Sequence, residues 1–110
     1  MMSTEEVIKE FKAAVNMTAA QIEKWLETDE SQSVGQKSSD DAESTGHHSG
    51  RSIVKILRKK QSDYAEDDFS QMRRVNSYVQ RHLAQRPEGD ITHTRWRYSL
   101  MNWGHEPEKQ

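Results

Sequence analysis

Residues 66–89 read EDDFSQMRRVNSYVQRHLAQRPEG, and this stretch decides what kind of fold the chain can form. Its acidic start suits the positive end of a helix dipole, with Asp63 or Asp67 as the candidate cap, and Pro87 and Gly89 would end a helix. The pattern predicts a long helix over residues 66–85. Its large apolar residues recur every three or four positions, the period of a helix that buries one face; they are Phe69, Met72, Val75, Val79 and Leu83.

A shorter helix is expected on the C-terminal side of this stretch, over residues 93–103. Trp96, Leu100 and Trp103 fall on one face of it, and Thr92 can cap its first turn. Gly104 then suits the left-handed residue that ends many helices. We expect residues 105–110 to form a frayed tail.

On the N-terminal side, the segment nearest to the long helix is residues 51–60, RSIVKILRKK. Ile53, Ile56 and Leu57 give it an inward-facing apolar stripe, and Ser49 is the candidate cap. We therefore predict a third helix here, with its remaining surface almost entirely basic.

Two further helices are predicted near the N-terminus, over residues 4–15 and 18–26, separated by a very short link. Each combines a helical apolar period with a capping box, in which a hydroxyl residue is followed three positions later by Glu or Gln. A short link favours a helical hairpin or corner. The two boxes are Ser3 with Glu6 and Thr18 with Gln21.

Residues 28–50 read TDESQSVGQKSSDDAESTGHHSG, and Val34 is their only large apolar residue. Such a segment buries too little apolar surface to offset the entropy lost on ordering. We therefore expect a long mobile loop here. The expected fold class is all-α, a compact bundle of about five helices that forms one domain over residues 1–110.

The composition argues against several functional classes. The chain has no cysteine, which removes disulfides, thiolate metal sites and cysteine nucleophiles. Its five histidines have no metal-ligand spacing, and no nucleophile motif frames any serine. We therefore expect no enzyme, metal or cofactor. With no apolar run of roughly 20 residues and an acidic rather than basic N-terminal segment, we expect no membrane partner and a cytoplasmic location.

Charge is divided unevenly along the chain. Residues 1–50 hold four Lys or Arg against ten Asp or Glu, whereas residues 51–110 hold twelve against eight. Clustered cations contact phosphates and release counterions, so the basic side of the third helix is a candidate DNA contact. The competing interpretation is an ordinary solvated helix face. The candidate residues are Arg51, Lys55, Arg58 and Lys59, with Lys60 and Arg74 as secondary contacts.

Several motifs together resemble a family of small, uncharacterised, mainly bacterial proteins usually labelled only "DNA-binding protein" or domain of unknown function. The closing string, WRYSLMNWGH, is the most specific of them, and the resemblance covers nearly the whole chain except residues 37–43. It implies DNA binding but no particular binding residues. The motifs are NMT at 16–18, WL at 25–26, SGR at 49–51, IV at 53–54, ILR at 56–58, Tyr78, RHL at 81–83 and WRYSLMNWGH at 96–105.

Charge and resemblance together predict a non-enzymatic DNA-binding protein that contacts the phosphate backbone through a basic helix. The alternative is a helical protein–protein interaction module, or a stress-related accessory regulator, with a protein partner. In that case the Trp-Arg-Tyr segment at 96–98 would be the contact surface. The tryptophans themselves are expected to pack in the core.

Overall fold

The computed structural model describes residues 3–34 and 45–109, and this part of the chain is all-helical, which confirms the predicted fold class. None of its helices is both long and apolar enough to cross a membrane. The elements are α1 (Thr4–Ala14), α2 (Ala19–Leu26), α3 (Asp29–Ser33), α4 (Thr45–Arg58), the 3-10 turn η1 (Gln61–Asp63), α5 (Glu66–Leu83) and α6 (Arg95–Asn102).

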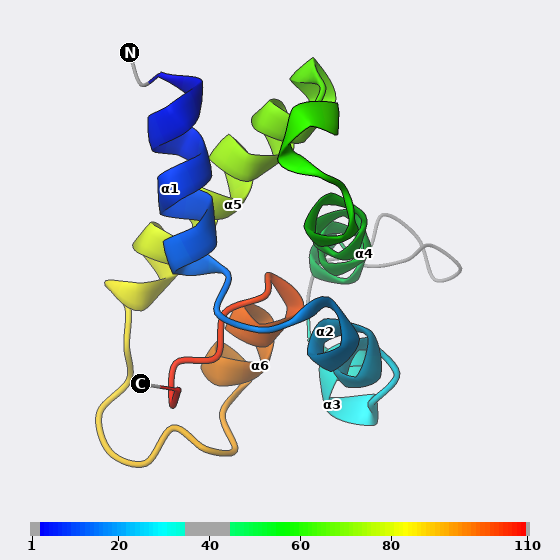
Figure 1. Ribbon diagram of the computed structural model, residues 1–110. Coiled ribbons are helices and arrows are strands. Elements are labelled where there is room, and N and C mark those ends of the chain that lie inside the picture. Colours follow the sequence, from blue (N-terminus) through cyan, green and yellow to red (C-terminus); the bar gives the residue numbers. More distant parts are fainter. Residues whose placement is uncertain (1–2, 35–44, 110) are drawn as a thin grey trace.

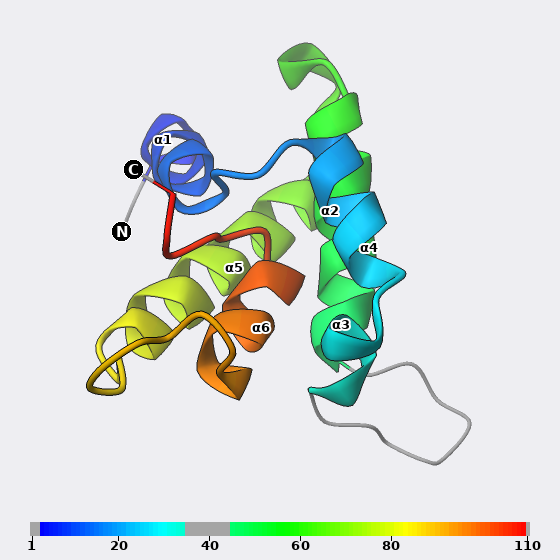
Figure 2. The same ribbon diagram turned by 90° about the horizontal axis from the view of Figure 1, so that it is seen from below.

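The helices form two pairs joined by α6. Helix α1 packs along α5, and α2 packs along α4, while α6 contacts α2, α3, α4 and α5 (Figures 1 and 2). Every one of these helices except α3 contributes large apolar side chains to a single core. The largest fully buried ones are Phe11, Ile22, Ile53, Ile56, Met72 and Leu100.

Both predicted cap residues of the N-terminal helices are confirmed, but only the second helix has the complete capping box that was expected at each. The Ser3 hydroxyl accepts a hydrogen bond from the Glu6 N–H at 3.2 Å. Thr18 and Gln21 form a complete capping box, because the Thr18 hydroxyl accepts from the Gln21 N–H at 3.1 Å and the Gln21 Oε1 accepts from the Thr18 N–H at 2.9 Å. Side-chain caps of this kind satisfy backbone donors that a helix start leaves open.

The structure differs from the sequence prediction at both ends of the expected loop over residues 28–50. Residues 29–33 form α3, and α4 begins at Thr45 rather than at Arg51. Ser49, the expected cap, is instead a buried interior residue of α4. Tertiary contacts explain the difference: Val34 is buried, and α3 packs on α6. The middle of the expected loop, residues 35–44, lies outside the described residues.

Helix α5 begins at Glu66, as predicted, but its cap residue and the start of α6 differ from the sequence prediction. Helix α5 begins after Ala65, whose N–H donates to the Asp68 carboxylate at 2.9 Å, so neither Asp63 nor Asp67 is the cap residue. Helix α6 is capped by Thr94 instead of Thr92, two residues later than predicted.

The C-terminal segment makes specific contacts over residues 105–109, where fraying was expected. The His105 ring Nδ1 lies 2.7 Å from the Ala14 carbonyl oxygen, and the Glu106 N–H donates to the Asn16 Oδ1 at 2.7 Å. Gly104 has a φ of +80°, as predicted for the residue that ends α6. The segment therefore returns to the α1–α2 link, as the path of the chain end in Figure 1 shows.

Four rings from α5 and α6 form one continuous stack. The order is Trp103, Tyr78, His82 and Trp96, with centroid separations of 4.1, 5.2 and 5.8 Å and nearly parallel planes. The Arg86 guanidinium caps the far end, 5.7 Å from the Trp96 ring centre. In addition, the Trp96 indole N–H donates to the His82 carbonyl at 2.7 Å. These contacts hold the C-terminal half of α5 against α6.

Because His82 is desolvated within this stack, its pKa is lowered from 6.5, although the hydrogen bond to the Trp96 carbonyl partly opposes the effect. The folded state therefore binds fewer protons than the unfolded state just below pH 6.5. We expect the free energy of unfolding to fall between pH 7.5 and 5.5, as unfolded histidine becomes protonated. Chemical denaturation at the two pH values measures this.

In the His82→Gln variant that pH-dependent loss should shrink, whatever the change in overall stability. His93→Gln, at an exposed histidine, is the matched control and should retain the wild-type difference. An unchanged difference in the His82→Gln variant would contradict the assignment.

Candidate nucleic-acid interface

Arg51, Lys55 and Arg58 lie together on the exposed side of α4, as the sequence predicts. Acidic side chains also lie beside this surface, because α2 packs alongside α4. The three residues line a hollow of about 400 Å³ together with Glu23 of α2 and with Glu27, which directly follows α2. The electrostatic character of the α4 surface is therefore mixed rather than uniformly positive.

Arg58 and Lys59, both predicted contact residues, are ion-paired. Arg58 makes a two-pronged pair with Glu23, in which Nη1 lies 3.0 Å from Oε2. Lys59 donates to the Asp68 Oδ2 at 2.8 Å, and this hydrogen bond lowers the pKa of Asp68 below its ordinary 3.8. The side chains of Arg58 and Glu23 are about half exposed. Exposed pairs of this kind contribute at most about 1 kcal/mol, so a polyanion could displace them at modest cost.

Lys55, Lys60 and Arg74 are exposed and make no ion pair with any other residue that the structure describes. Lys55 lies on α4, Lys60 in the link that follows it, and Arg74 on α5. The predicted set is thus spread over two helices and the link between them, and only part of it is free of intramolecular acids.

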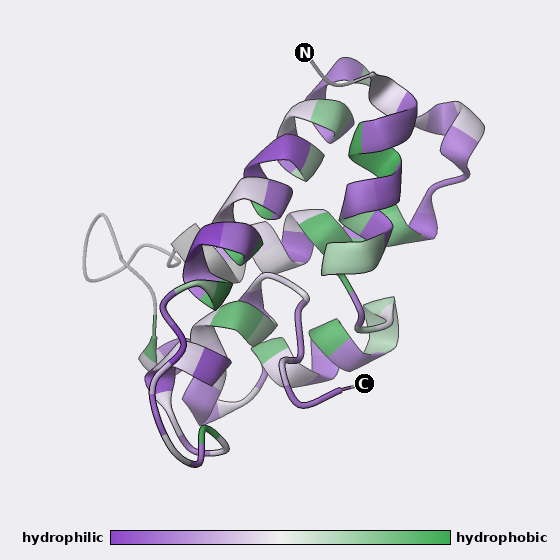
Figure 3. Ribbon diagram, turned by 90° about the vertical axis from the view of Figure 1, so that its left-hand side faces the viewer, coloured by the Kyte–Doolittle hydropathy of each residue, from purple (hydrophilic) through white to green (hydrophobic). Residues whose placement is uncertain are grey.

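Most of α5 lies within a long acid-free stretch of the sequence. No Asp or Glu occurs from Phe69 to Pro87. Arg73, Arg74 and Arg81 are exposed, opposite the buried face of the helix. Sequence reasoning placed only Arg74 in the site, although the missing acids over this stretch were a readable signal for the other two. Figure 3 shows the alternation of hydrophilic and hydrophobic residues along the helices that produces such faces.

Other cations and aromatic rings of the C-terminal half have structural roles. Arg97 is mostly buried and pairs with Glu106, and its Nη1 also donates to the Thr92 carbonyl at 2.8 Å. Trp96 and Trp103 are buried in the core, as predicted. Within residues 3–34 and 45–109, no cluster of three His, Asp or Glu could hold a metal ion.

The described part of this small protein is thus all-helical, with exposed Lys and Arg side chains on α4 and α5. A family model described as "Protein of unknown function (DUF3140)" matches residues 10–101, so the chain belongs to this family. The predicted resemblance to an uncharacterised family is thereby confirmed. No curated protein and no solved structure matches the chain.

Proposed function

We propose that this protein binds duplex DNA through its phosphates and catalyses no reaction. The observation that carries the proposal is the exposed arginine face of α5, which has no acidic residue over 19 consecutive positions, 69–87. Lys55 and Lys60 add two exposed cations that form no ion pair with a described acid. Phosphate contacts of this kind draw their free energy from counterion release.

The spacing of the α5 arginines suits a polyanion. At a rise of 1.5 Å per residue, Arg73 and Arg81 are separated by roughly 12 Å along the helix axis. Phosphates of one DNA strand are spaced by about 3.4 Å along the duplex axis, so this helix face spans several of them. Ser70, Ser77 and Gln80 lie exposed between the arginines and can donate to phosphate oxygens. Nothing in this set favours one base over another, so we expect weak sequence specificity.

The α4 residues and those that directly follow α4 are only peripheral DNA contacts in this proposal. Arg58 and Lys59 must leave Glu23 and Asp68 before they can pair with phosphates, and Glu23 and Glu27 repel a nearby DNA strand. We therefore assign the main contacts to Arg73, Arg74 and Arg81. Arg51, Lys55, Arg58, Lys59 and Lys60 form the periphery.

Two matched double variants test this assignment, because each removes two positive charges. In a fluorescence anisotropy titration with random-sequence duplex DNA, Arg73→Ala with Arg74→Ala should reduce the slope of log affinity against log salt by about 2. Arg58→Ala with Lys59→Ala should reduce it by less than half as much, since each cation already has a partner. Equal slopes in wild type and both variants, or no binding at low salt, would remove the proposal.

A helical protein-interaction module is the second candidate, and the hollow between α2 and α4 favours it. Its rim carries charges of both signs around Leu26 and Val54, which is an arrangement typical of protein interfaces. The charge-reversal pair Glu23→Lys and Glu27→Lys separates the two functions. It should strengthen DNA binding if phosphates approach α4, and abolish recognition by a protein partner that docks there.

A further inference from the structure

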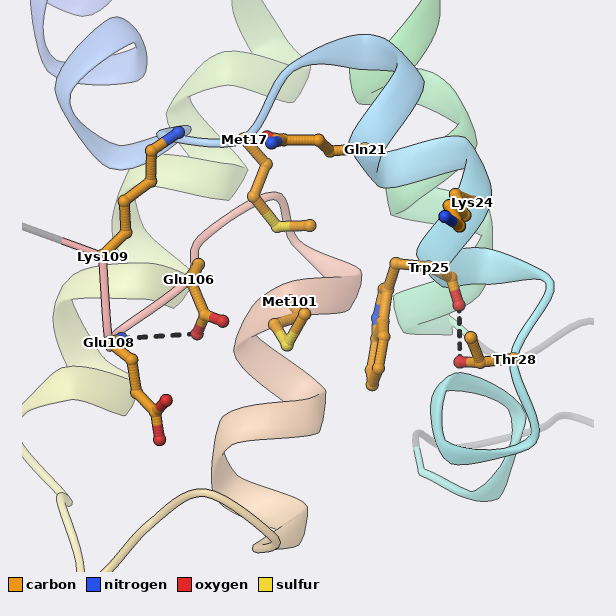
Figure 4. Close-up of a pocket in the computed structure, with 9 residues that line it drawn as sticks. All are labelled: Met17, Gln21, Lys24, Trp25, Thr28, Met101, Glu106, Glu108 and Lys109. Atoms are coloured by element: carbon orange, nitrogen blue, oxygen red, sulfur yellow. Dashed lines mark hydrogen bonds between the residues drawn. The ribbon is translucent and has the colours of Figure 1, made fainter.

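A second, larger hollow lies on the opposite side of α2, where α2 and α6 meet the C-terminal segment (Figure 4). Its volume is about 510 Å³, within the range that holds small organic ligands. Its apolar surface is provided by Met17, Trp25 and Met101. Neither proposed function uses this hollow.

The aromatic wall of the hollow is held in place. The Trp25 indole N–H donates to the Asn102 Oδ1 at 2.7 Å, and its ring lies 5.5 Å from that of Tyr98. By contrast, Met17 and Met101 have flexible thioether side chains that adapt to the shape of a ligand and contact aromatic rings favourably. A fixed indole facing two adaptable thioethers suits a flat aromatic group.

The polar rim has unused hydrogen-bonding capacity on one side only. On α2, the Lys24 ammonium has no ion-pair partner among the described residues, and Gln21 uses its Oε1 on the Thr18 N–H but leaves its amide donors open. The C-terminal rim is already satisfied, because Glu106 is paired with Arg97 and the Lys109 ammonium donates to the Asn16 carbonyl. The open groups are therefore a cation and an amide donor.

The charged residues are distributed unevenly around the rim. Lys24 and Gln21 lie on the α2 side, whereas Glu106 and Glu108 lie on the side of the C-terminal segment (Figure 4). On the C-terminal side the Lys109 ammonium is offset by Glu108 and hydrogen-bonded to Asn16, so an anionic group would be attracted mainly to the α2 side, which orients a ligand with one charged end.

We infer that this hollow binds a small aromatic carboxylate, with its ring between Trp25 and the two methionines and its carboxylate beside Lys24. The volume of the hollow limits the size of the ligand. The Trp25 indole and the methionine thioethers favour an aromatic ring, and the unpaired Lys24 ammonium favours a carboxylate. This site is independent of the arginine face of α5, so either proposal can fail without the other.

The test uses the full chain with ¹³C-methyl methionine and 3-phenylpropionate as the probe. The methyl resonances of Met17 and Met101 should shift during the titration, while that of Met72, buried in the core, stays in place. The alcohol 3-phenylpropanol has the same ring without the charge and should bind more weakly. No shift up to about 10 mM probe, or equal shifts of all three methyls, would overturn the inference.

Lys24→Gln tests the carboxylate contact, because Lys24 is exposed and its replacement should leave the fold intact. We expect this variant to weaken 3-phenylpropionate binding three- to five-fold, the effect of one exposed charge pair, and to leave 3-phenylpropanol binding unchanged. Lys9→Gln, the same change at an exposed position of α1, should alter neither.

Equal weakening of acid and alcohol by Lys24→Gln, or no weakening of either, would overturn the carboxylate assignment. Tighter binding of the tripeptide Ala-Ala-Phe than of 3-phenylpropionate would assign the hollow to the end of a protein chain. That result would overturn the small-molecule assignment.

Discussion

Replacing Gly50 by valine should lower the free energy of unfolding by about 3 kcal/mol or more, because the residue lies at the closest approach of three helices. A Cβ atom at this position would lie 2.7 Å from the backbone oxygen of Asn102 and 2.8 Å from the Leu26 Cδ2. The Leu26 side chain is itself buried, and the Asn102 carbonyl belongs to the end of α6. The Asn102 oxygen is a backbone atom and cannot move without shifting α6 away from α4, and the Leu26 side chain can rotate only within a packed core.

The smaller change Gly50→Ala gives a sharper test, since two effects oppose each other. Alanine favours a helix by roughly 1 kcal/mol over glycine. Overpacking typically costs 1–3 kcal/mol, so the contacts at Gly50 should still make the alanine variant less stable than wild type. Chemical denaturation measures both variants, with Ser77→Val on the exposed side of α5 as the control that should change little. An alanine variant more stable than wild type would contradict the close packing.

Gly50 also shows why the sequence patterns failed near residues 45–50. Glycine and serine are poor helix formers, and in the sequence they read as a loop that ends before Arg51. In the structure Ser49 and Gly50 are the small residues that allow α2, α4 and α6 to approach one another. Small side chains are needed here because of Leu26, about 25 positions earlier, and Asn102, about 50 positions later. Local sequence patterns cannot reveal contacts over such distances.

The five long helices were predictable because each has a strong apolar period of its own. Phe69, Met72, Val75 and Val79 specify α5 without help from the rest of the chain. The short helix α3 was not predictable, because its order depends on α6. Its five residues are polar, and one of them, Ser31, is completely buried through contacts with Asn102.

The candidate DNA site was only partly predictable for a similar reason. The cations themselves were visible in the sequence, and the structure places them on exposed helix faces. Their partners were not visible: Glu23 lies 35 residues before Arg58, and only the packing of α2 on α4 brings them together. Charge counting alone cannot distinguish the paired face of α4 from the acid-free face of α5.

The string WRYSLMNWGH, the most specific part of the family resemblance, has mainly architectural contacts. Trp96 and Trp103 end the ring stack, Arg97 pairs with Glu106, and Gly104 adopts a positive φ against Val15. Asn102 connects α6 to α2 and α3. This string therefore specifies how α6 joins the two helix pairs, and the proposed DNA contacts lie elsewhere.

Asn102→Leu should consequently cost about 3 kcal/mol or more, although leucine has a similar volume. Asn102 accepts hydrogen bonds from the Trp25 indole and from the Ser31 hydroxyl, and its own amide donates to the Ser31 carbonyl at 3.2 Å. Leaving a buried polar group unsatisfied costs about 1–3 kcal/mol. The loss should also free α3, so backbone amides of residues 29–34 should exchange faster with solvent.

A double-mutant cycle separates these hydrogen bonds from simple packing. Ser31→Ala removes one partner and should cost less than Asn102→Leu, because the Trp25 bond survives. Either single change already breaks the Ser31–Asn102 hydrogen bond, and the double variant also lacks the hydroxyl that Asn102→Leu alone leaves unsatisfied, so the combined loss should fall short of the sum by at least about 0.5 kcal/mol. Additive losses would mean that the Ser31–Asn102 hydrogen bond does not contribute to stability. Non-additive losses would establish that this buried amide holds α3 against α6, a contact that the sequence patterns did not predict.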